Sequence, residues 1–351
     1  MHTLAETYDV ALVDLDGVVY VGPDAVDHAA AALAQARRAG MRLAFVTNNA
    51  ARPPSEVAAH LGRLGISADA DEVITSAQAA ARVLAAALPP GARVLVVGGE
   101  GLVAALGEHG LTPVSSADAD PVAVVSGFHP DVGWRLLAEG AFAVATGVPW
   151  VASNTDRTLP TPRGVAPGNG TLVDAIRSAT GRDPVVAGKP EIPMHEEMVL
   201  RTEARHPLVV GDRLDTDIEG ARRAGVDSLL VLTGVTGPAQ LVTAARRHRP
   251  TFLGEDLRAL AEPPDTLAVA PGLVEHGGFS ATVERGTIVV QRSPARADGR
   301  FVDAVRTICG AAWAAADNGD RVAGVDAALA AAARIADAAA ARPDDGDDVL
   351  A

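Results

Sequence analysis

The chain has 351 residues, of which 48% are hydrophobic, and 30 Lys plus Arg against 44 Asp plus Glu give it a formal net charge of −14. This length favours two or three domains, and the hydrophobic content excludes a disordered protein. The acidic balance, part of which lies in the tail from Ala341, argues against nucleic acid or an anionic membrane surface as a partner.

The single cysteine and the N-terminus bear on the compartment. Cys309 cannot form an intramolecular disulfide bond, so we interpret it as a core residue in a reducing compartment. The N-terminal segment MHTLAETYD has neither a basic region nor an apolar stretch of signal-peptide length, and no window approaches a membrane span. We therefore expect a cytoplasmic protein that binds neither nucleic acid nor membrane.

The first ninety residues alternate strand and helix signals. Strands are predicted at Val10–Val13 and Leu43–Val46, and helices at about 26–39 and 54–64, ended by Gly40 and Gly65. Strands that alternate with helices of this length indicate βαβ units and a parallel sheet with right-handed crossovers. Active groups should then lie at the carboxyl ends of the strands.

A second alternating block runs from a strand at Arg93–Val97 to a helix at about 172–180, with strands at 122–125 and 150–152 and a helix at 132–138 between them. It lies between VTNN at Val46–Asn49 and GKP at Gly188–Pro190. If those two motifs share a site, the block must be an inserted domain beside it, and it can act as a lid. The first sheet is predicted to resume with strands at 185–187, 208–210 and 228–232 and a helix at 217–224, which Gly225 ends.

The third region follows a predicted linker, LAEPPDTL, at 260–267. A strand near 266–270, a hairpin at 279–292 and two helices are expected, and the apolar face of the second helix comprises Val322, Val325, Leu329, Ala332 and Ile335. An acyltransferase site is not supported, because QRSPARADGR lacks a glycine-rich pyrophosphate cradle. We assign 1–91 and 183–262 to the core, 92–182 to the inserted domain, and 265–351 to an accessory α+β region with an acidic tail.

The segment VALVDLDGVV at Val10–Val19 carries an apolar strand into two carboxylates, Asp14 and Asp16, followed by Gly17. Side chains alternate with period two along a strand, so both carboxylates start on the same side, and the glycine lets the chain turn beyond them. An isolated D-x-D would more often only end a strand. Here VTNN, GKP and VVGDRLDTD at Val209–Asp217 follow in the order that phosphoryl-transfer chemistry requires.

These motifs predict a phosphatase mechanism. Asp14 is suited to attack phosphorus and form an aspartyl phosphate, and Asp16, if protonated, can donate to the leaving oxygen and then activate water. Because the carboxylates and the phosphoryl group are all negative, a cation is needed, and hard oxygen ligands with open positions fit Mg²⁺. Asp212, at the end of the strand LVVG, is the natural further ligand beside Asp14.

The other motifs supply phosphate contacts. Thr47 offers a hydroxyl, Asn48 and Asn49 offer successive backbone N–H groups, and Lys189 offers a compact positive charge after a buried strand. For Asp217, support of the site from behind the metal ligands and helix N-capping are equally favoured, whereas N-capping is favoured for its neighbour Asp215.

DLDGV, VTNNA, GKP and GDRLDTDIEGA, in this order and spacing, resemble the haloacid dehalogenase superfamily, in particular the branch of NagD and 4-nitrophenylphosphatase. The segment from Val151 to Pro190 and the segment SGFHPDVGWRLL resemble that branch's α/β cap of C2 type. The resemblance implies a Rossmann-like α/β fold: a doubly wound parallel-sheet core, an inserted cap and a small C-terminal domain.

The resemblance also implies roles by position. Asp14 is implied as nucleophile and metal ligand, Asp16 as general acid/base and as a ligand through its backbone carbonyl, and Asp212 as a side-chain ligand. Phosphate binding is implied for Thr47, Asn48, Asn49 and Lys189. The cap loop over the substrate is implied at 154–160, with Asn154, Asp156 and Leu159. Relatives place a histidine near the position at which this chain has Leu159. Many relatives also have an aspartate at the position of His129.

The extension beyond Pro264 is most similar to that of actinobacterial members of this branch assigned to glycerol 3-phosphate. We therefore expect a small phosphate monoester as substrate, first of all glycerol 3-phosphate. Phosphoglycolate, pyridoxal phosphate and nucleotide monophosphates remain alternatives, as does a regulatory protein that binds a phosphorylated ligand without turnover. A phosphorelay receiver is disfavoured, because it would not need the inserted block. A homodimer is possible.

Overall fold

A six-stranded parallel sheet forms the centre of the molecule. The computed structural model describes residues 2–161, 163–267, 269, 272–293 and 299–340. In spatial order the strands are β15 (Phe252–Gly254), β14 (Asp227–Val231), β13 (Pro207–Gly211), β1 (Val10–Asp14), β4 (Arg42–Thr47) and β5 (Val73–Thr75). Every neighbouring pair is parallel, and β1, which is buried throughout, lies between β13 and β4. The predicted parallel core sheet is confirmed.

Helices cover both faces of this sheet. The helices of the core are α1 (Leu4–Thr7), α2 (Ala29–Arg38), α3 (Pro54–Arg63), α4 (Ser76–Ala87), α8 (Ile192–Thr202), α9 (Glu219–Ala224) and α10 (Pro238–Val242). One apolar cluster joins α2 and α3 to one set of strand side chains, and a second joins α4, α8 and α9 to the alternate set. This alternation is why the core strands are apolar on both faces. No helix in the described ranges is long and apolar enough to cross a membrane.

The inserted block folds around a second parallel sheet. Its strands, in spatial order, are β12 (Val185–Val186), β9 (Trp150–Ala152), β8 (Ala123–Ser126), β6 (Arg93–Val97) and β7 (Thr112–Val114). Helices α5 (Glu100–Glu108), α6 (Trp134–Ala145) and α7 (Asn169–Thr180) accompany it, together with a hairpin of β10 (Thr158–Thr161) and β11 (Gly164–Pro167). The assignment of 185–187 to the core sheet is wrong, because β12 pairs with β9 before the chain returns to the core.

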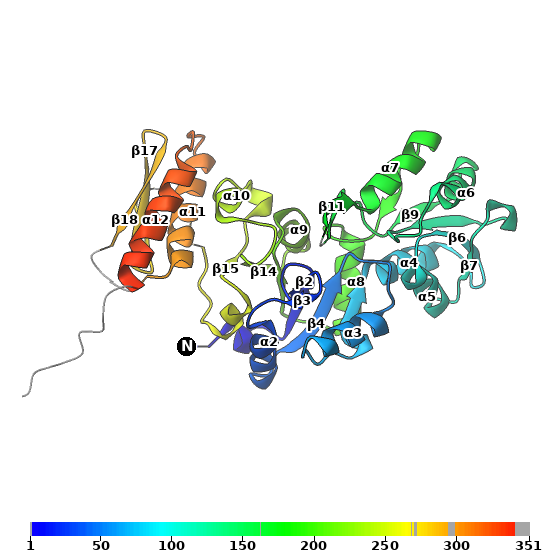
Figure 1. Cartoon of the computed structure of the whole chain (residues 1–351), viewed down its shortest axis with the longest axis horizontal. Helices are drawn as coiled ribbons and strands as arrows, with labels where there is room; N and C mark the ends of the chain where they lie inside the picture. The colour runs from blue at the N-terminus through cyan, green and yellow to red at the C-terminus, as the bar shows by residue number, and fades with distance from the viewer. Residues whose placement is uncertain (1, 162, 268, 270–271, 294–298, 341–351) are drawn as a thin grey trace, which may run out of the picture.

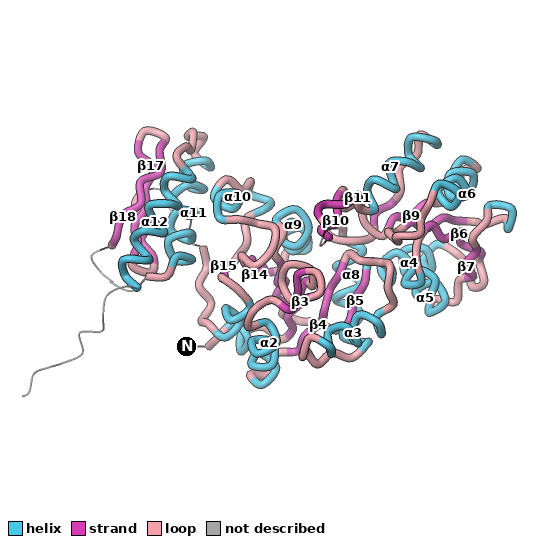
Figure 2. Tube along the Cα trace, in the orientation of Figure 1, coloured by secondary structure: helices cyan, strands magenta, loops and turns pink. Residues whose placement is uncertain are grey.

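The C-terminal region is an antiparallel sheet covered by two helices. The strands are β16 (Val274–His276), β17 (Phe279–Glu284) and β18 (Thr287–Arg292), and the helices are α11 (Phe301–Asp317) and α12 (Val325–Ala340). The strand expected at 266–270 is only an isolated bridge from Thr266 to Phe252, and residues 268 and 270 of that prediction, like the tail from Ala341, lie outside the described residues. Figures 1 and 2 show the C-terminal region, the core and the inserted domain in a row.

The C-terminal region shares its apolar core with the central domain. Trp313 and Ile308 of α11 lie in one buried cluster with Leu241 of α10 and with Leu214 and Ile218, which flank the acidic segment after β13. The predicted core position of Cys309 is confirmed, because its side chain is fully buried in α11. The region therefore packs as a continuation of the core, next to the wall of the candidate site.

Candidate active site

The carboxyl ends of three adjacent strands bring the first motifs together. Asp14 ends β1, Thr47 ends β4 and Asp212 directly follows β13. Because β4 and β13 are the two parallel neighbours of β1, the three residues lie at one edge of the sheet. Three segments that are far apart in the sequence therefore meet, as the motif order predicts.

Lys189 is the buried cation of this edge. Its Nζ donates to Asp14 Oδ1 at 2.5 Å and to Asp217 Oδ1 at 2.7 Å, and only 8% of the side chain is exposed. Burial opposes the positive charge, but Asp14 and Asp217 outweigh it and raise the pKa of Lys189. An ammonium group has three N–H donors, so one remains for a ligand oxygen. Lys189 is thus a permanent positive charge beside the predicted nucleophile.

Three buried carboxylates surround this lysine and leave an excess of negative charge. Oxygen atoms of Asp14, Asp212 and Asp217 lie within 4.8 Å of one another. Burial, reinforced by the neighbouring carboxylates, raises the pKa of Asp14, and burial together with Asp217 raises that of Asp212 to about 6. A divalent cation bound among these oxygens would balance the charge that Lys189 leaves uncompensated.

The surroundings of the Asp212 carboxylate suit the binding of such a cation. Its Oδ2 accepts a hydrogen bond from Val235 N at 2.6 Å, whereas its buried Oδ1 has no partner among the described residues. A Cβ on Gly17 would lie 2.5 Å from Asp212 Oδ2, and one on Gly234 would lie 2.0 Å from the same atom. Two glycines therefore leave room for the carboxylate, and Gly17 also has φ +89, which favours glycine. An orphaned oxygen in an all-oxygen donor set fits Mg²⁺.

Asp16 lies two residues beyond the end of β1. Its side chain is exposed, and its backbone forms a bridge with Tyr20 at the start of the short hairpin β2 (Tyr20–Val21) and β3 (Asp24–Ala25). The surrounding protein still desolvates the carboxyl and raises its pKa, against the opposing charges of Lys189 and Arg52. The Asp16 carboxylate is outside the buried acidic cluster, which leaves its backbone carbonyl as its predicted contact with the metal. Arg52, which follows VTNN closely, was not singled out from the sequence.

The VTNN turn is held by its own side chains. Thr47 Oγ1 accepts from Asn49 N at 3.0 Å, and Asn49 Oδ1 accepts from Ala51 N at 2.9 Å. The Thr47 hydroxyl keeps its proton for a ligand oxygen. The side-chain amide of Asn48 is bound instead to the backbone of Lys189 and to Asp156, so phosphate contact by Asn48 is open only to its backbone.

Asp217 supports the site through Lys189 and is not the N-cap of a helix. Its Oδ1 accepts from Lys189 Nζ and its Oδ2 accepts from Arg213 N at 3.1 Å, but Asp217 itself lies inside the turn Leu214–Ile218, whose N-cap residue is Arg213. The capping role favoured for Asp215 is wrong. The N-cap residues of the two helical segments here are Arg213 and Ile218, and the Arg213 guanidinium holds the Asp215 carboxylate through two hydrogen bonds of 2.8 and 3.1 Å.

The cap loop reaches the core through two of its three predicted residues. Asn154 Nδ2 donates to Asn48 O at 2.7 Å, and Asp156 Oδ2 accepts from Asn48 Nδ2 at 3.1 Å. Asn169, at the start of α7, donates to Asn154 O at 2.6 Å and was missed, because a single asparagine before a helix carries no distinctive signal. Leu159 lies in β10, and no polar contact links it to the acidic cluster.

The chain is similar to known proteins over most of its length. A family model for haloacid dehalogenase-like hydrolases matches residues 11–112, and a HAD-hydrolase-like model matches residues 186–260. The chain is 47% identical over 319 residues to the D-glycerol 3-phosphate phosphatase of Mycobacterium tuberculosis. This alignment covers 90% of this chain and 88% of the relative.

Solved structures agree. The crystal structure of a glycerol phosphate phosphatase from Mycobacterium tuberculosis in complex with magnesium has a TM-score of 0.82 at 47% identity, over 89% of this chain and 92% of that one. A p-nitrophenyl phosphatase from Archaeoglobus fulgidus has a TM-score of 0.67 at 28% identity, over 72% of this chain and 98% of that one. Sequence, fold and site geometry together establish that this chain belongs to the haloacid dehalogenase-like hydrolases, as the motifs predict.

Proposed function

We propose that this chain is a magnesium-dependent phosphatase that hydrolyses glycerol 3-phosphate through an aspartyl phosphate. The observation that carries this proposal is the position of Lys189 between Asp14 and Asp217, within a cluster of three buried carboxylates. A cation of fixed charge beside a carboxylate nucleophile is what a transferring phosphoryl group requires. The identity of 47% to a D-glycerol 3-phosphate phosphatase over most of both chains supports the choice of substrate.

In the first step an oxygen of Asp14 attacks phosphorus. A bond forms between that oxygen and phosphorus while the bond from phosphorus to the substrate alcohol breaks. Asp16 gives its proton to the departing alcohol oxygen, and desolvation favours the protonated form that this step needs. Lys189 and the Thr47 hydroxyl hold the phosphoryl oxygens and orient the phosphorus toward Asp14.

In the second step Asp16 acts as a base. It takes a proton from water while the water oxygen bonds to phosphorus, and the bond from phosphorus to Asp14 breaks to release inorganic phosphate. Mg²⁺, held by Asp14, Asp212 and the backbone carbonyl of Asp16, would neutralise the negative charge shared by the carboxylates and the phosphoryl group. Asp217 would support this arrangement through Lys189.

Two measurements test the proposal. Steady-state release of phosphate, with Mg²⁺ present, should give a higher kcat/KM for glycerol 3-phosphate than for phosphoglycolate, pyridoxal phosphate and nucleotide monophosphates. Acid-quenched reactions should trap a phosphoryl group on Asp14, and Asp14→Asn should lose both the trapped species and turnover while its thermal unfolding stays unchanged. Full activity of Asp14→Asn would refute the mechanism, and a poor rank for glycerol 3-phosphate would refute the substrate.

The same assay decides the regulatory alternative, because a protein that only binds phosphorylated ligands would release no phosphate over many turnovers. The homodimer stays a prediction, and light scattering at micromolar concentration checks it.

A further inference from the structure

The side chain of Asn48 is fully engaged by protein partners. Its Nδ2 donates to Lys189 O at 3.1 Å and to Asp156 Oδ2 at 3.1 Å, and its Oδ1 accepts from Lys189 N at 2.8 Å. A primary amide has only two N–H donors, so none remains for a phosphate oxygen. The partners also fix the orientation of the amide, because a flipped group would place its oxygen against a carbonyl and a carboxylate.

The backbone of Asn48 also contacts the cap loop. Its carbonyl oxygen accepts from Asn154 Nδ2 at 2.7 Å and from Ser76 Oγ at 2.6 Å. A Cβ on Gly188 would lie 2.6 Å from Asn48 Oδ1 and 2.4 Å from Ser153 O, which shows how closely the three segments approach. The end of β4, the turn that carries Lys189 and the cap loop therefore meet at one residue.

We propose that Asn48 is a positioning residue that couples the seating of the cap loop to the placement of Lys189. When Asp156 is seated, it holds one N–H of the Asn48 amide, and the rest of that amide clamps the Lys189 backbone on both its N–H and its C=O. The Lys189 ammonium then lies against Asp14 and Asp217. When the loop leaves, Asn48 loses this anchor and the clamp loosens. This role rests on the function proposed above for Lys189.

The coupling has a physical reason. Displacement of a catalytic group by about 1 Å can cost on the order of 10²-fold in rate, even when the change lies away from the reacting atoms. A cap that aligns the lysine only when it is seated would favour chemistry after the substrate is enclosed. Asp156 is partly buried, and this burial raises its pKa against the opposing effect of the Asn48 hydrogen bond.

A double-mutant cycle tests the inference on the full-length enzyme with Mg²⁺ and 4-nitrophenyl phosphate. We expect Asn48→Ala to lower kcat by about 10- to 100-fold with KM changed less than about threefold, since positioning is lost and not binding. Asp156→Ala should lower kcat less, and the double variant should be no worse than Asn48→Ala, since both changes break one linkage. Asp156→Asn, which keeps an oxygen acceptor for Asn48, should recover most of the loss.

Additive effects of the two substitutions would overturn the inference, and so would no recovery of kcat in Asp156→Asn. A third contrary outcome is that Asn48→Ala keeps its kcat but shows a higher KM and a higher inhibition constant for inorganic phosphate. That last pattern would mean that Asn48 binds phosphate directly. Asn318→Ala, an exposed change of the same chemistry at the end of α11, should match the wild type.

Two further variants keep the result interpretable. If Asn48→Ala does not fold, Asn48→Asp replaces it, because a carboxylate keeps an acceptor for Lys189 N but loses both donors and repels Asp156, so a loss of kcat at least as large is expected. Lys189→Met separates the two proposals. Full activity of Lys189→Met would refute the proposed site itself, whereas an inactive Lys189→Met with an additive cycle would refute only the role of Asn48.

Discussion

The ammonium of Lys189 lies 2.7 Å from the carboxylate of Asp217, and both side chains are buried. Asp217 is the last carboxylate of the acidic segment after β13, and the same ammonium also contacts Asp14, so two carboxylates hold the lysine. Removing one partner of a buried charge leaves the other groups uncompensated, which makes this contact a sensitive point of the site.

Asp217→Asn should keep the hydrogen bond to Lys189 but remove one negative charge from the cluster. We expect the apparent affinity for Mg²⁺ to fall by about 10- to 100-fold, because the groups around metal ligands fix their orientation and charge. Activity measured against Mg²⁺ concentration checks this. Asp215→Asn is the control, because Asp215 is exposed and pairs with Arg213, and an equal fall in both variants would contradict the prediction.

Gly234→Ala should displace the carboxylate of Asp212, because the new Cβ would lie 2.0 Å from its Oδ2. We expect weaker Mg²⁺ binding and loss of most phosphatase activity, with little change in the thermal midpoint measured without metal. Gly237→Ala is the matched control, since a Cβ at Gly237 meets nothing within 4 Å. Wild-type activity of Gly234→Ala would show that Asp212 does not need its present position.

Removal of divalent metal should stop turnover. The three carboxylates around one lysine repel one another without a counterion, and chelation with EDTA followed by added Mg²⁺ should abolish and then restore phosphate release. A second readout is stability, because a ligand that binds only the folded state raises its unfolding midpoint. If EDTA changes neither the activity nor the thermal midpoint, a metal site here is excluded.

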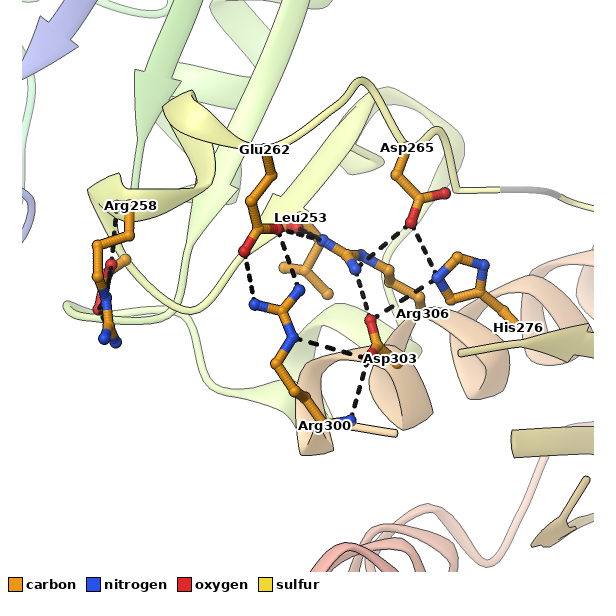
Figure 3. Close-up of polar contacts among 9 residues, drawn as sticks. Leu253, Arg258, Glu262, Asp265, His276, Arg300, Asp303 and Arg306 are labelled. Carbon is orange, nitrogen blue, oxygen red and sulfur yellow. Dashed lines mark hydrogen bonds and ion pairs between the residues drawn. The ribbon is translucent and has the colours of Figure 1, made fainter. Parts of the chain in front are cut away.

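His276 should make stability fall at alkaline pH. It contacts Asp265 at 2.9 Å and Asp303 at 3.7 Å in the ion-pair network that joins the C-terminal region to the core (Figure 3). Hydrogen bonds to Asp265 and Asp303 raise its pKa from 6.5 to about 9. Because the folded pKa exceeds the unfolded one, the contribution is complete below about pH 6.5 and is lost as the pH rises through about 9.

The shift sets an upper limit of about 3 kcal/mol, which the partial exposure of His276 reduces to about 1 to 2 kcal/mol. Urea unfolding of the wild type and His276→Gln should differ by this amount at pH 6 and converge at pH 10. A difference that does not change with pH would show that His276 stabilises the fold without its charge.

Trp313→Ala should destabilise the whole protein by about 3 to 5 kcal/mol, because it empties a buried site of α11. Trp313 Nε1 donates to Leu241 O at 3.2 Å, and the Arg249 guanidinium lies 5.0 Å from the ring centroid. Urea unfolding checks this, with Trp134→Ala as the control, since Trp134 is 79% exposed. An effect of Trp313→Ala as small as that of Trp134→Ala would mean that the packing of α11 does not contribute to the stability of the protein.

The sequence by itself determined the family, the parallel core and the residues that meet at its edge. The alternation of side chains along strands, the glycines that end helices and the order of the four motifs can all be recognised along the chain. The carboxyl ends of neighbouring parallel strands then lie together at one edge of the sheet. The positions of Asp14, Thr47 and Asp212 at that edge follow from this rule. This rule does not place Lys189, because the strand before it, β12, pairs with β9 of the inserted domain, and only the fold brings Lys189 to the edge of the core sheet.

Tertiary structure alone decided what each side chain contacts. Pairing of β12 with β9 and the full engagement of the Asn48 amide depend on segments that no local pattern relates. The same holds for the C-terminal region, whose apolar residues share one buried cluster with those beside Asp217. Hydrogen bonds and packing select partners by distance in space, and that distance exists only once the chain has folded.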